Sequence, residues 1–489
     1  MTVEVRKGLV VLAVCAGMLL AALDATVVGT AMPTVVASLG GLSLYAWVFS
    51  IYMLGATTSM PLFGKLSDLY GRRRLFLAAI GIFTAGSTLC GAAASMPQLV
   101  GARAVQGLGA GGIFALAQAI FGDLFSPEER GRMQGYLASV WGLSSIVGPL
   151  LGGLIVDTFG WRWTFLVNVP VGACAAAVIH RGLTGALARG SRRPLDIPGA
   201  FALTGAVLAL LLAALRLGET GTLVTPGTLV PLALFGILSG TLLHLERRAP
   251  EPVLPLRLFE NRAFSVSILA ATLSGVGMFG AISFLPLFVQ GVLGGSATLA
   301  GSVLTPMSLG WSSGSTLGGR LVNRMGYRAL GLAGMSLMAA AYLRLAHLTA
   351  GSGLAGIIGT VFVLGLGMGF VTVTTVVAVQ NAVRREDLGI ATTAPFFFRN
   401  IGATVGVAVM GAILTGRLGA GPAGALLRFE PSLALQAFEP LRGPLASALS
   451  AAFGVGLATA VLGLGASALL PSTSPTRGAR APASAPPGP

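Results

Sequence analysis

The chain has 489 residues, of which 54% are hydrophobic and only 10% are charged, and its mean hydropathy is +0.85. A soluble protein carries roughly 25% charged residues, so this composition excludes an ordinary soluble domain. The net charge of +15 does not indicate a nucleic-acid partner, because the arginines occupy short loops between apolar runs, where they orient membrane helices. The composition therefore predicts a polytopic membrane protein.

Fourteen apolar runs approach the length of about 20 residues that a membrane-spanning helix needs. They lie near residues 8–33, 45–64, 75–94, 98–121, 134–157, 163–181, 198–217, 226–246, 264–288, 297–320, 328–348, 353–379, 395–416 and 446–470. An even number of spans places both termini on one side, and the loops of that side hold most of the 31 basic residues. The positive-inside rule then predicts that both termini are cytoplasmic, in a cytoplasmic membrane.

The first run contains Asp24, the one acidic residue that lies well inside a predicted span. An ionised aspartate at the centre of a membrane helix costs about 2.5–3.5 kcal/mol, so it is a functional candidate by default. Arg103 lies inside the fourth run, at a depth that differs from that of Asp24 by about 6 Å at 1.5 Å per residue. The two side chains are expected to meet, either as a proton-coupling pair or as a static structural pair.

The loop after the second run concentrates charge in the stretch "GKLSDLYGRRRLF", which begins at Gly64. Asp68 is the only acid among its arginines, and it can form charge-assisted hydrogen bonds with Arg72 and Arg73 or with a helix amino terminus. Gly64 and Gly71 permit a close approach and a tight turn. A topological anchor would explain the arginines but not Asp68.

The fifth run contains "GPLLGG", which begins at Gly148. Pro149 removes one backbone donor and crowds the preceding turn, which predicts a bend in this helix. Gly148, Gly152 and Gly153 would let another helix approach closely.

Other residue types give weaker or negative signals. Polar and aromatic side chains in the spans could line a substrate cavity, although interhelical hydrogen bonding and packing use the same residues. The candidates of this kind are Gln106, Gln290 and Phe284. The three cysteines have no motif spacing and the three histidines form no cluster, so we expect no disulfide framework and no metal site. No nucleotide-binding glycine loop occurs, and no cofactor is expected.

The stretch at Gly64 is echoed by "GRLVNRMGYR", which begins at Gly319 and matches Asp68 with Asn323 and Gly71 with Gly326. Internal repeats around a central site are typical of secondary transporters. We therefore predict two six-helix halves separated by two extra helices. The predicted divisions are residues 1–190 for the first half, 191–250 for the extra helices, 251–470 for the second half and 471–489 for a disordered cytoplasmic tail.

These motifs, in their order along the chain, resemble those of the major facilitator superfamily, and in particular its fourteen-helix drug:proton antiporters. "LDATVVGTAMP" resembles the first-helix motif of that group, "GKLSDLYGRRRLF" the loop between helices 2 and 3, "LVGARAVQGLGAGG" the fourth-helix motif and "GPLLGG" the fifth-helix antiporter motif. Gly29, Leu69 and Ser144 depart from the usual residues of these motifs. The resemblance implies that the loop at Asp68 is a cytoplasmic latch, and that Arg103 takes part in proton transfer.

The resemblance thus implies an all-α membrane protein with the major facilitator fold and no enzymatic activity. Its expected function is proton-coupled antiport that exports small lipophilic compounds or drugs by alternating access, as a monomer. A dedicated exporter of a metabolite, siderophore or lipid would share the fold and the motifs. A non-transporting membrane sensor or assembly factor is the alternative from another class of protein.

Overall fold

The computed structural model describes residues 7–39, 45–182, 196–220, 224–249, 252–295, 299, 302–384, 387–418 and 442–472, and every regular element in these ranges is a helix. The first seven helices are α1 (Lys7–Leu39), α2 (Tyr45–Tyr70), α3 (Arg72–Ala92), α4 (Met96–Leu124), α5 (Pro127–Phe159), α6 (Trp163–Leu166) and α7 (Asn168–Gly182). The others are α8 (Ile197–Thr220), α9 (Pro226–Arg248), the 3-10 helix η2 (Leu256–Glu260), α10 (Arg262–Gly291), α12 (Thr305–Leu345), α13 (Leu354–Ala382), α14 (Leu388–Leu418) and α17 (Arg442–Ala468).

These helices agree with the fourteen predicted spans. Within the described ranges, nine segments are long and apolar enough to cross a membrane by length and composition. Each predicted span overlaps a helix when α6 and α7 are taken together and α12 is divided at Gly326, where its backbone leaves the helical conformation. The prediction of an all-α polytopic membrane protein is therefore confirmed.

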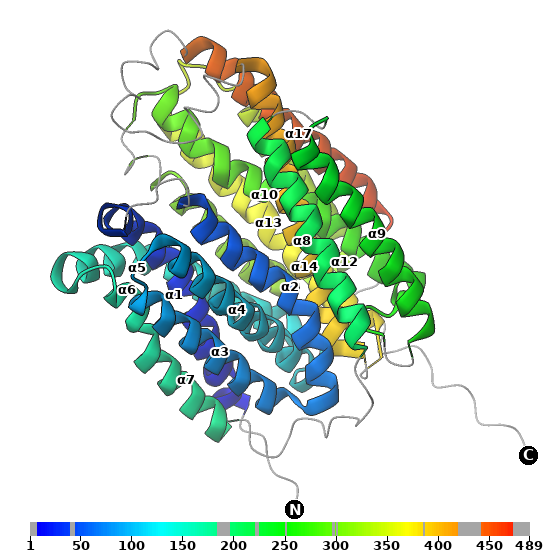
Figure 1. Ribbon diagram of the computed structural model, residues 1–489. Helices are drawn as coiled ribbons and strands as arrows, with labels where there is room; N and C mark the ends of the chain where they lie inside the picture. Colours follow the sequence, from blue (N-terminus) through cyan, green and yellow to red (C-terminus); the bar gives the residue numbers. More distant parts are fainter. Residues whose placement is uncertain are drawn as a thin grey trace, which may run out of the picture.

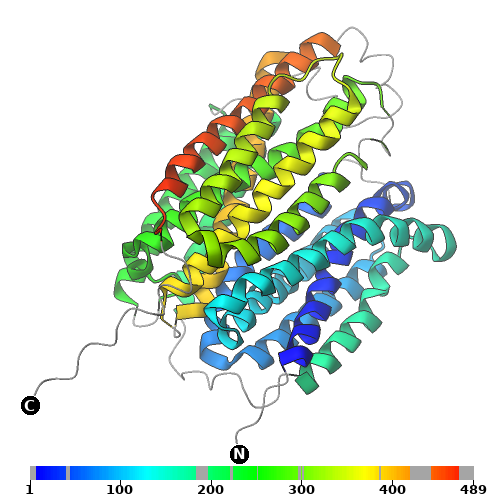
Figure 2. The same cartoon turned by 180° about the vertical axis from the view of Figure 1, so that it is seen from behind.

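The helices form two bundles, with α1–α7 in the first half and α10–α17 in the second (Figures 1 and 2). The two extra helices, α8 and α9, pack on each other, and α8 also contacts α14 and α2. The predicted division at residue 190 lies outside the described residues, as do residue 250 and all but the start of the predicted tail. The exact limits of the halves therefore stay predictions.

The predicted repeat has the same backbone geometry in both copies. Gly71, between α2 and α3, has a φ of 91°, and Gly326 has a φ of 80°. L side chains rarely adopt positive φ, so both positions favour glycine for the same reason. The turn that follows α2 thus recurs inside α12, at the position that the sequence repeat assigns to it.

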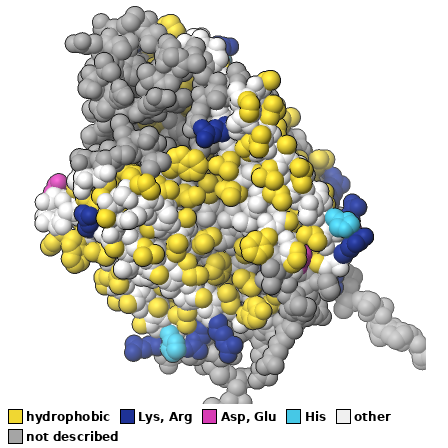
Figure 3. Space-filling model, in the orientation of Figure 1, with side chains coloured by type: hydrophobic (Ala, Val, Ile, Leu, Met, Phe, Trp, Pro, Cys, Tyr) yellow, Lys and Arg dark blue, Asp and Glu magenta, His cyan; other side chains and the backbone are white. Residues whose placement is uncertain are grey.

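One end of the bundle, here called the basic end, is held together by arginine and lysine side chains. The chain both enters α1 and leaves α17 at this end, and basic side chains gather along the corresponding lower and right edges of Figure 3, beside a broad hydrophobic face. The bonds that define the basic end join Lys7 to Glu129, Arg72 to Asp123, Arg130 to Gln380 and Arg328 to Leu470, at 2.7–3.0 Å.

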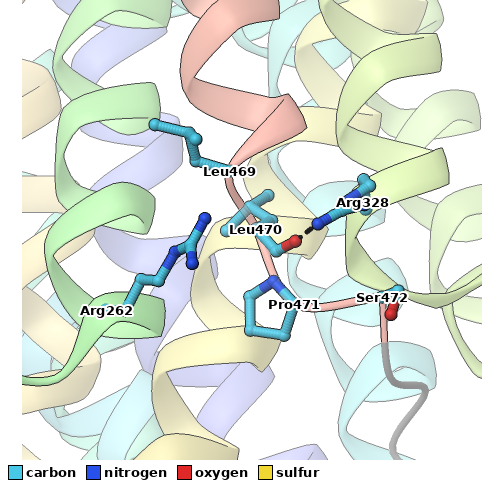
Figure 4. A pocket seen from close by; sticks show the side chains of 6 residues that line it. All are labelled: Arg262, Arg328, Leu469, Leu470, Pro471 and Ser472. Carbon is cyan, nitrogen blue, oxygen red and sulfur yellow. Dashed lines mark hydrogen bonds between the residues drawn. The ribbon is translucent and has the colours of Figure 1, made fainter.

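A hollow opens beside the end of α17, where Arg328 Nε donates to the carbonyl oxygen of Leu470 (Figure 4). It is lined by Arg262, Arg328 and residues 469–472. None of the site residues predicted from the sequence lies in it.

The two halves contact each other between the basic end and the middle of the bundle. Arg130 joins α5 to α13 at the basic end, and α5 also packs closely on α12. Nearer the middle, Asn400 Nδ2 of α14 donates to Thr57 Oγ1 of α2 at 3.2 Å. Toward the opposite end the ribbons of the two halves diverge (Figures 1 and 2). The structure is therefore closed at the basic end.

Gly107 places α4 directly against α2. A Cβ atom added at Gly107 would overlap the backbone carbonyl oxygen of Tyr52, so a larger residue would force the helices apart. Gly107→Ala is expected to lower the free energy of unfolding by about 1–3 kcal/mol, the usual cost of overpacking. Thermal unfolding of the purified protein in detergent measures this loss.

The matched control is Gly101→Ala on the same helix, where an added Cβ would have no atom within 4 Å. Its midpoint of unfolding is expected to stay within the range of the wild type or to rise slightly, because alanine favours the helix. Equal midpoints for the two variants would contradict the close packing of α4 on α2.

Candidate functional site

Asp24 on α1 and Arg103 on α4 form an ion pair inside the first half. Arg103 Nη1 lies 2.7 Å from Asp24 Oδ2, and both residues are only 1% exposed. The structure thus brings together the two residues that the sequence placed at similar depth. A buried pair of this kind is stable only when hydrogen bonds satisfy the remaining atoms of both groups.

Neutral side chains supply those hydrogen bonds to the carboxylate. Gln106 Nε2 and Asn168 Nδ2 each donate to Asp24 Oδ1 at 2.8 Å. The same two amides donate to Ser87 Oγ at 3.1 and 3.0 Å, and Ser87 Oγ donates to the carbonyl oxygen of Phe165. Asp24, Ser87, Arg103, Gln106 and Asn168 are called the Asp24 network below. It links α1, α3, α4 and α7.

The guanidinium of Arg103 is covered by α2. Its Cζ lies 4.0 Å from the centroid of the Tyr52 ring, and its Nε donates to the carbonyl oxygen of Val48 at 3.3 Å. Aromatic faces and carbonyl oxygens attract a cation, but neither carries a full negative charge. Asp24 is thus the one residue of the network that neutralises Arg103.

Two members of the network, Ser87 and Asn168, were not predicted as site residues. A lone hydroxyl or amide in an apolar run usually makes an interhelical hydrogen bond, so the sequence alone does not separate them from packing residues. Gln106 was predicted to line a substrate cavity. The structure buries it completely in the Asp24 network, and its contact with a substrate stays a prediction.

The loop at the basic end contains a second cluster of charges. Arg72 Nη2 lies 2.6 Å from Asp68 Oδ1, its Nε lies 2.7 Å from Asp123 Oδ2, and its Nη1 donates to Ser67 Oγ. Asp68 Oδ2 is buried without a hydrogen-bond partner among the described residues. Asp68 and Arg72 both face Gly389, in the first turn of α14. The cluster thus ties three helices of the first half together and meets the amino terminus of a helix from the second.

Asp68 lies beyond the apolar run that ends at residue 64, and the pKa of its carboxyl is raised. Burial raises the pKa of its carboxyl to about 6, against the lowering effect of the Arg72 guanidinium. Asp68 therefore carries its charge above this value and loses it as the pH falls through about 6.

At the surface, a hydrogen bond from Lys7 holds the pKa of Glu129 below its ordinary value.

The remaining predicted residues of this loop lie at helix junctions. Arg73 Nη2 lies 2.9 Å from His180 Nδ1, which connects the start of α3 to the end of α7. Gly64 faces α14, and a Cβ added there would lie 3.0 Å from Thr393 Oγ1. The glycine thus permits the close approach of α2 to the second half.

The motif on α5 lies against α1. A Cβ at Gly148 would overlap the side chain of Thr26, so this glycine permits close packing of the two helices. Gly152 is buried, whereas Gly153 has no atom within 4 Å of an added Cβ. Pro149 belongs to α5, but its side chain lies outside the described residues, and the bend expected there stays a prediction.

Phe284 and Gln290 were the other residues predicted to line a substrate cavity. Phe284 is 3% exposed and packs in the hydrophobic core of the second half. The side chain of Gln290 lies outside the described part of the chain. Across the described ranges, no group of three His, Cys, Asp or Glu side chains is placed to hold a metal ion.

Comparison with known proteins assigns these features to one family. The sequence model of the Major Facilitator Superfamily matches residues 14–407. Multidrug transporter protein MdtP of Bacillus subtilis is 39% identical over 419 residues, which cover 85% of this chain and 76% of that protein. Multidrug resistance protein 3 of the same organism is 37% identical over 409 residues, with coverage of 83% and 79%.

A solved structure supports the fold. The human organic anion transporter MFSD10 (TETRAN) superposes with a TM-score of 0.64 at 16% identity, over 93% of this chain and 99% of that protein. At this identity the likeness concerns the fold alone. Because the family match spans most of the chain, the protein belongs to the major facilitator superfamily, among relatives of the multidrug efflux type, and is a membrane transporter rather than an enzyme.

Proposed function

We propose that the protein is a proton-coupled antiporter, which exports small lipophilic compounds across the cytoplasmic membrane by alternating access. The observation that carries this proposal is the buried ion pair of Asp24 and Arg103, an acid and a base held away from water in a membrane protein. The names of the relatives MdtP and Multidrug resistance protein 3 support drugs as the cargo.

The ion pair provides a physical link between proton binding and conformation. A proton on Asp24 would leave the guanidinium of Arg103 buried without a counter-ion. Removing one partner of a buried pair typically costs about 3–5 kcal/mol. If this free-energy cost is present in one conformation of the protein and absent in another, it is large enough to shift the equilibrium between the two conformations.

The positive-inside rule makes the basic end cytoplasmic, together with the start of α1 and the end of α17. The structure, which is closed at the basic end, would then face outward, with the cluster of Asp68, Arg72 and Asp123 as its closed latch. A proton that enters from outside is driven inward by the membrane potential, which supplies about 2.3 kcal/mol per charge at 100 mV.

The test is transport into everted vesicles that contain the full chain, with fluorescent lipophilic compounds of positive, zero and negative charge. Wild-type uptake is expected to require the proton gradient and to stop when a protonophore is added. Asp24→Asn is expected to reduce gradient-driven uptake at least tenfold at equal expression, because an amide cannot carry the proton.

Asp157→Asn, a change at an exposed acid on α5, is the matched control and is expected to transport like the wild type. Uptake that persists with the protonophore, or in Asp24→Asn, would overturn coupling through Asp24. Uptake of a single compound from the panel would favour a dedicated exporter on the same fold.

A further inference from the structure

Arg399 on α14 is a third buried arginine beside Arg72 and Arg103, and among the described residues it has no carboxylate partner, unlike the other two. The residue is 8% exposed. Its Nη1 donates to Thr372 Oγ1 of α13 at 3.0 Å, and its Nε is buried with no hydrogen-bond partner among the described residues. No acidic side chain of the described ranges forms an ion pair with it, so none of the described carboxylates balances its positive charge.

Unbalanced charge in a membrane helix is costly and usually marks a pathway or a ligand. The contrast with Arg103 is informative, because both arginines are buried and, within the described ranges, Arg103 has a carboxylate counter-ion whereas Arg399 has none. A carboxylate on a neighbouring helix can neutralise a buried arginine permanently, as Asp24 does for Arg103. The lack of such a partner at Arg399 among the described residues is what a site for a reversibly bound anionic ligand would show.

The surroundings of Arg399 are aromatic. Its Cζ lies 4.6 Å from the centroid of the Phe396 ring and 5.6 Å from that of Trp311 on α12. Trp311 Nε1 is also buried without a hydrogen-bond partner in the described part of the chain. Arg399, Trp311, Phe396 and Thr372 are called the Arg399 cluster. It combines unsatisfied donors with aromatic faces.

The Arg399 cluster lies where the two halves meet. Phe396 packs edge-on against Phe114 of α4, with ring centroids 4.6 Å apart. Asn400, the residue after Arg399, donates to Thr57 of α2 across the same interface. These contacts would separate if the halves moved apart at the basic end, as the proposed alternating access requires, and that movement would expose Phe396 beside Arg399.

We propose that the Arg399 cluster binds the carboxylate of an aromatic organic acid, so that the cargo of this transporter includes lipophilic organic anions. The planar fork of a guanidinium matches both oxygens of a carboxylate, and the indole N–H offers a further donor. The aromatic rings suit the apolar body of such a ligand. This inference rests on the proposed export function and specifies its substrate class.

Equilibrium binding to the purified full chain in detergent, measured by isothermal titration calorimetry, tests the proposal without any proton gradient. The probes are 1-naphthoate and its neutral analogue 1-naphthamide, at a pH where the acid is fully ionised. The wild type is expected to bind the carboxylate at least tenfold more tightly than the amide. Arg399→Gln is expected to remove this preference and to leave the affinity for the amide unchanged.

Two further variants keep the test decisive. Arg417→Gln, at an exposed arginine on the same helix, is the matched control and is expected to retain the preference. Trp311→Phe keeps a ring but removes the indole N–H, and is expected to weaken carboxylate binding about threefold; it serves as the second variant should Arg399→Gln fail to fold.

Each result has a defined meaning. Equal affinity of the wild type for the two probes, binding of neither, or an unchanged preference in Arg399→Gln would overturn the carboxylate site. Carboxylate preference without proton-driven uptake would instead overturn antiport and leave the site standing. Proton-driven uptake without the preference would do the reverse.

Discussion

Replacing Arg103 with methionine is expected to lower the free energy of unfolding by about 3–5 kcal/mol, and adding Asp24→Asn is expected to restore most of that loss. The single variant leaves the carboxyl group of Asp24 buried with amide donors and without its counter-ion. The double variant removes both charges and retains hydrogen bonding at position 24. Unfolding in detergent of the wild type, the two single variants and the double variant gives the coupling energy between the two side chains.

The exposed pair of Lys7 and Glu129 is the matched control cycle. Their side chains are 53% and 41% exposed, and such pairs contribute about 0.2–1 kcal/mol. Lys7→Met with Glu129→Gln is therefore expected to show a small coupling energy that salt weakens. If the losses of Arg103→Met and Asp24→Asn simply add, the two residues do not act as a pair, and the proposed link between protonation and conformation loses its basis.

The fold and the ion pair could be predicted from the sequence because both depend on strong, local signals. Apolar runs of membrane length define the helices, and an acid inside such a run is too costly to be incidental. Ser87 and Asn168 could not be predicted, since neutral polar groups cost little in a helix and their role depends on three-dimensional neighbours. The repeat that matches Gly71 with Gly326 could be recognised from the sequence because a positive φ favours glycine at both positions.

Arg399 was missed because of an uncertain helix boundary. The predicted span of residues 395–416 places this arginine close to its start, where a basic side chain is ordinarily interfacial. The structure begins α14 at Leu388, so Arg399 lies about three turns inside the helix. Thr392 and Thr393 precede the apolar run and are completely buried, which no local hydropathy pattern reveals.

Gly389→Leu is expected to prevent closure at the basic end. A Cβ at this position would overlap Asp68 Oδ1 and would lie 2.6 Å from Arg72 Nη1. Arg72 cannot easily move away, because Asp123 and Ser67 also bind it. Asp68 is restrained in turn by its ion pair with Arg72. A cost of about 1–3 kcal/mol from overpacking, applied only to the closed state, would raise the ratio of open to closed protein roughly 5–150-fold.

A disulfide between the halves measures this shift. A Cβ at Gly135 on α5 would lie 3.5 Å from Thr316 Cβ on α12, within the range of about 3.5–4.5 Å for disulfides. With the three native cysteines replaced by alanine, Gly135→Cys with Thr316→Cys is expected to cross-link readily, and adding Gly389→Leu is expected to slow the reaction. Gly416→Leu, on the same helix with no atom near an added Cβ, is the matched control. Because the control changes helix α14 equally but leaves the Asp68 cluster untouched, equal cross-linking rates for the two leucine variants would show that this cluster does not govern closure.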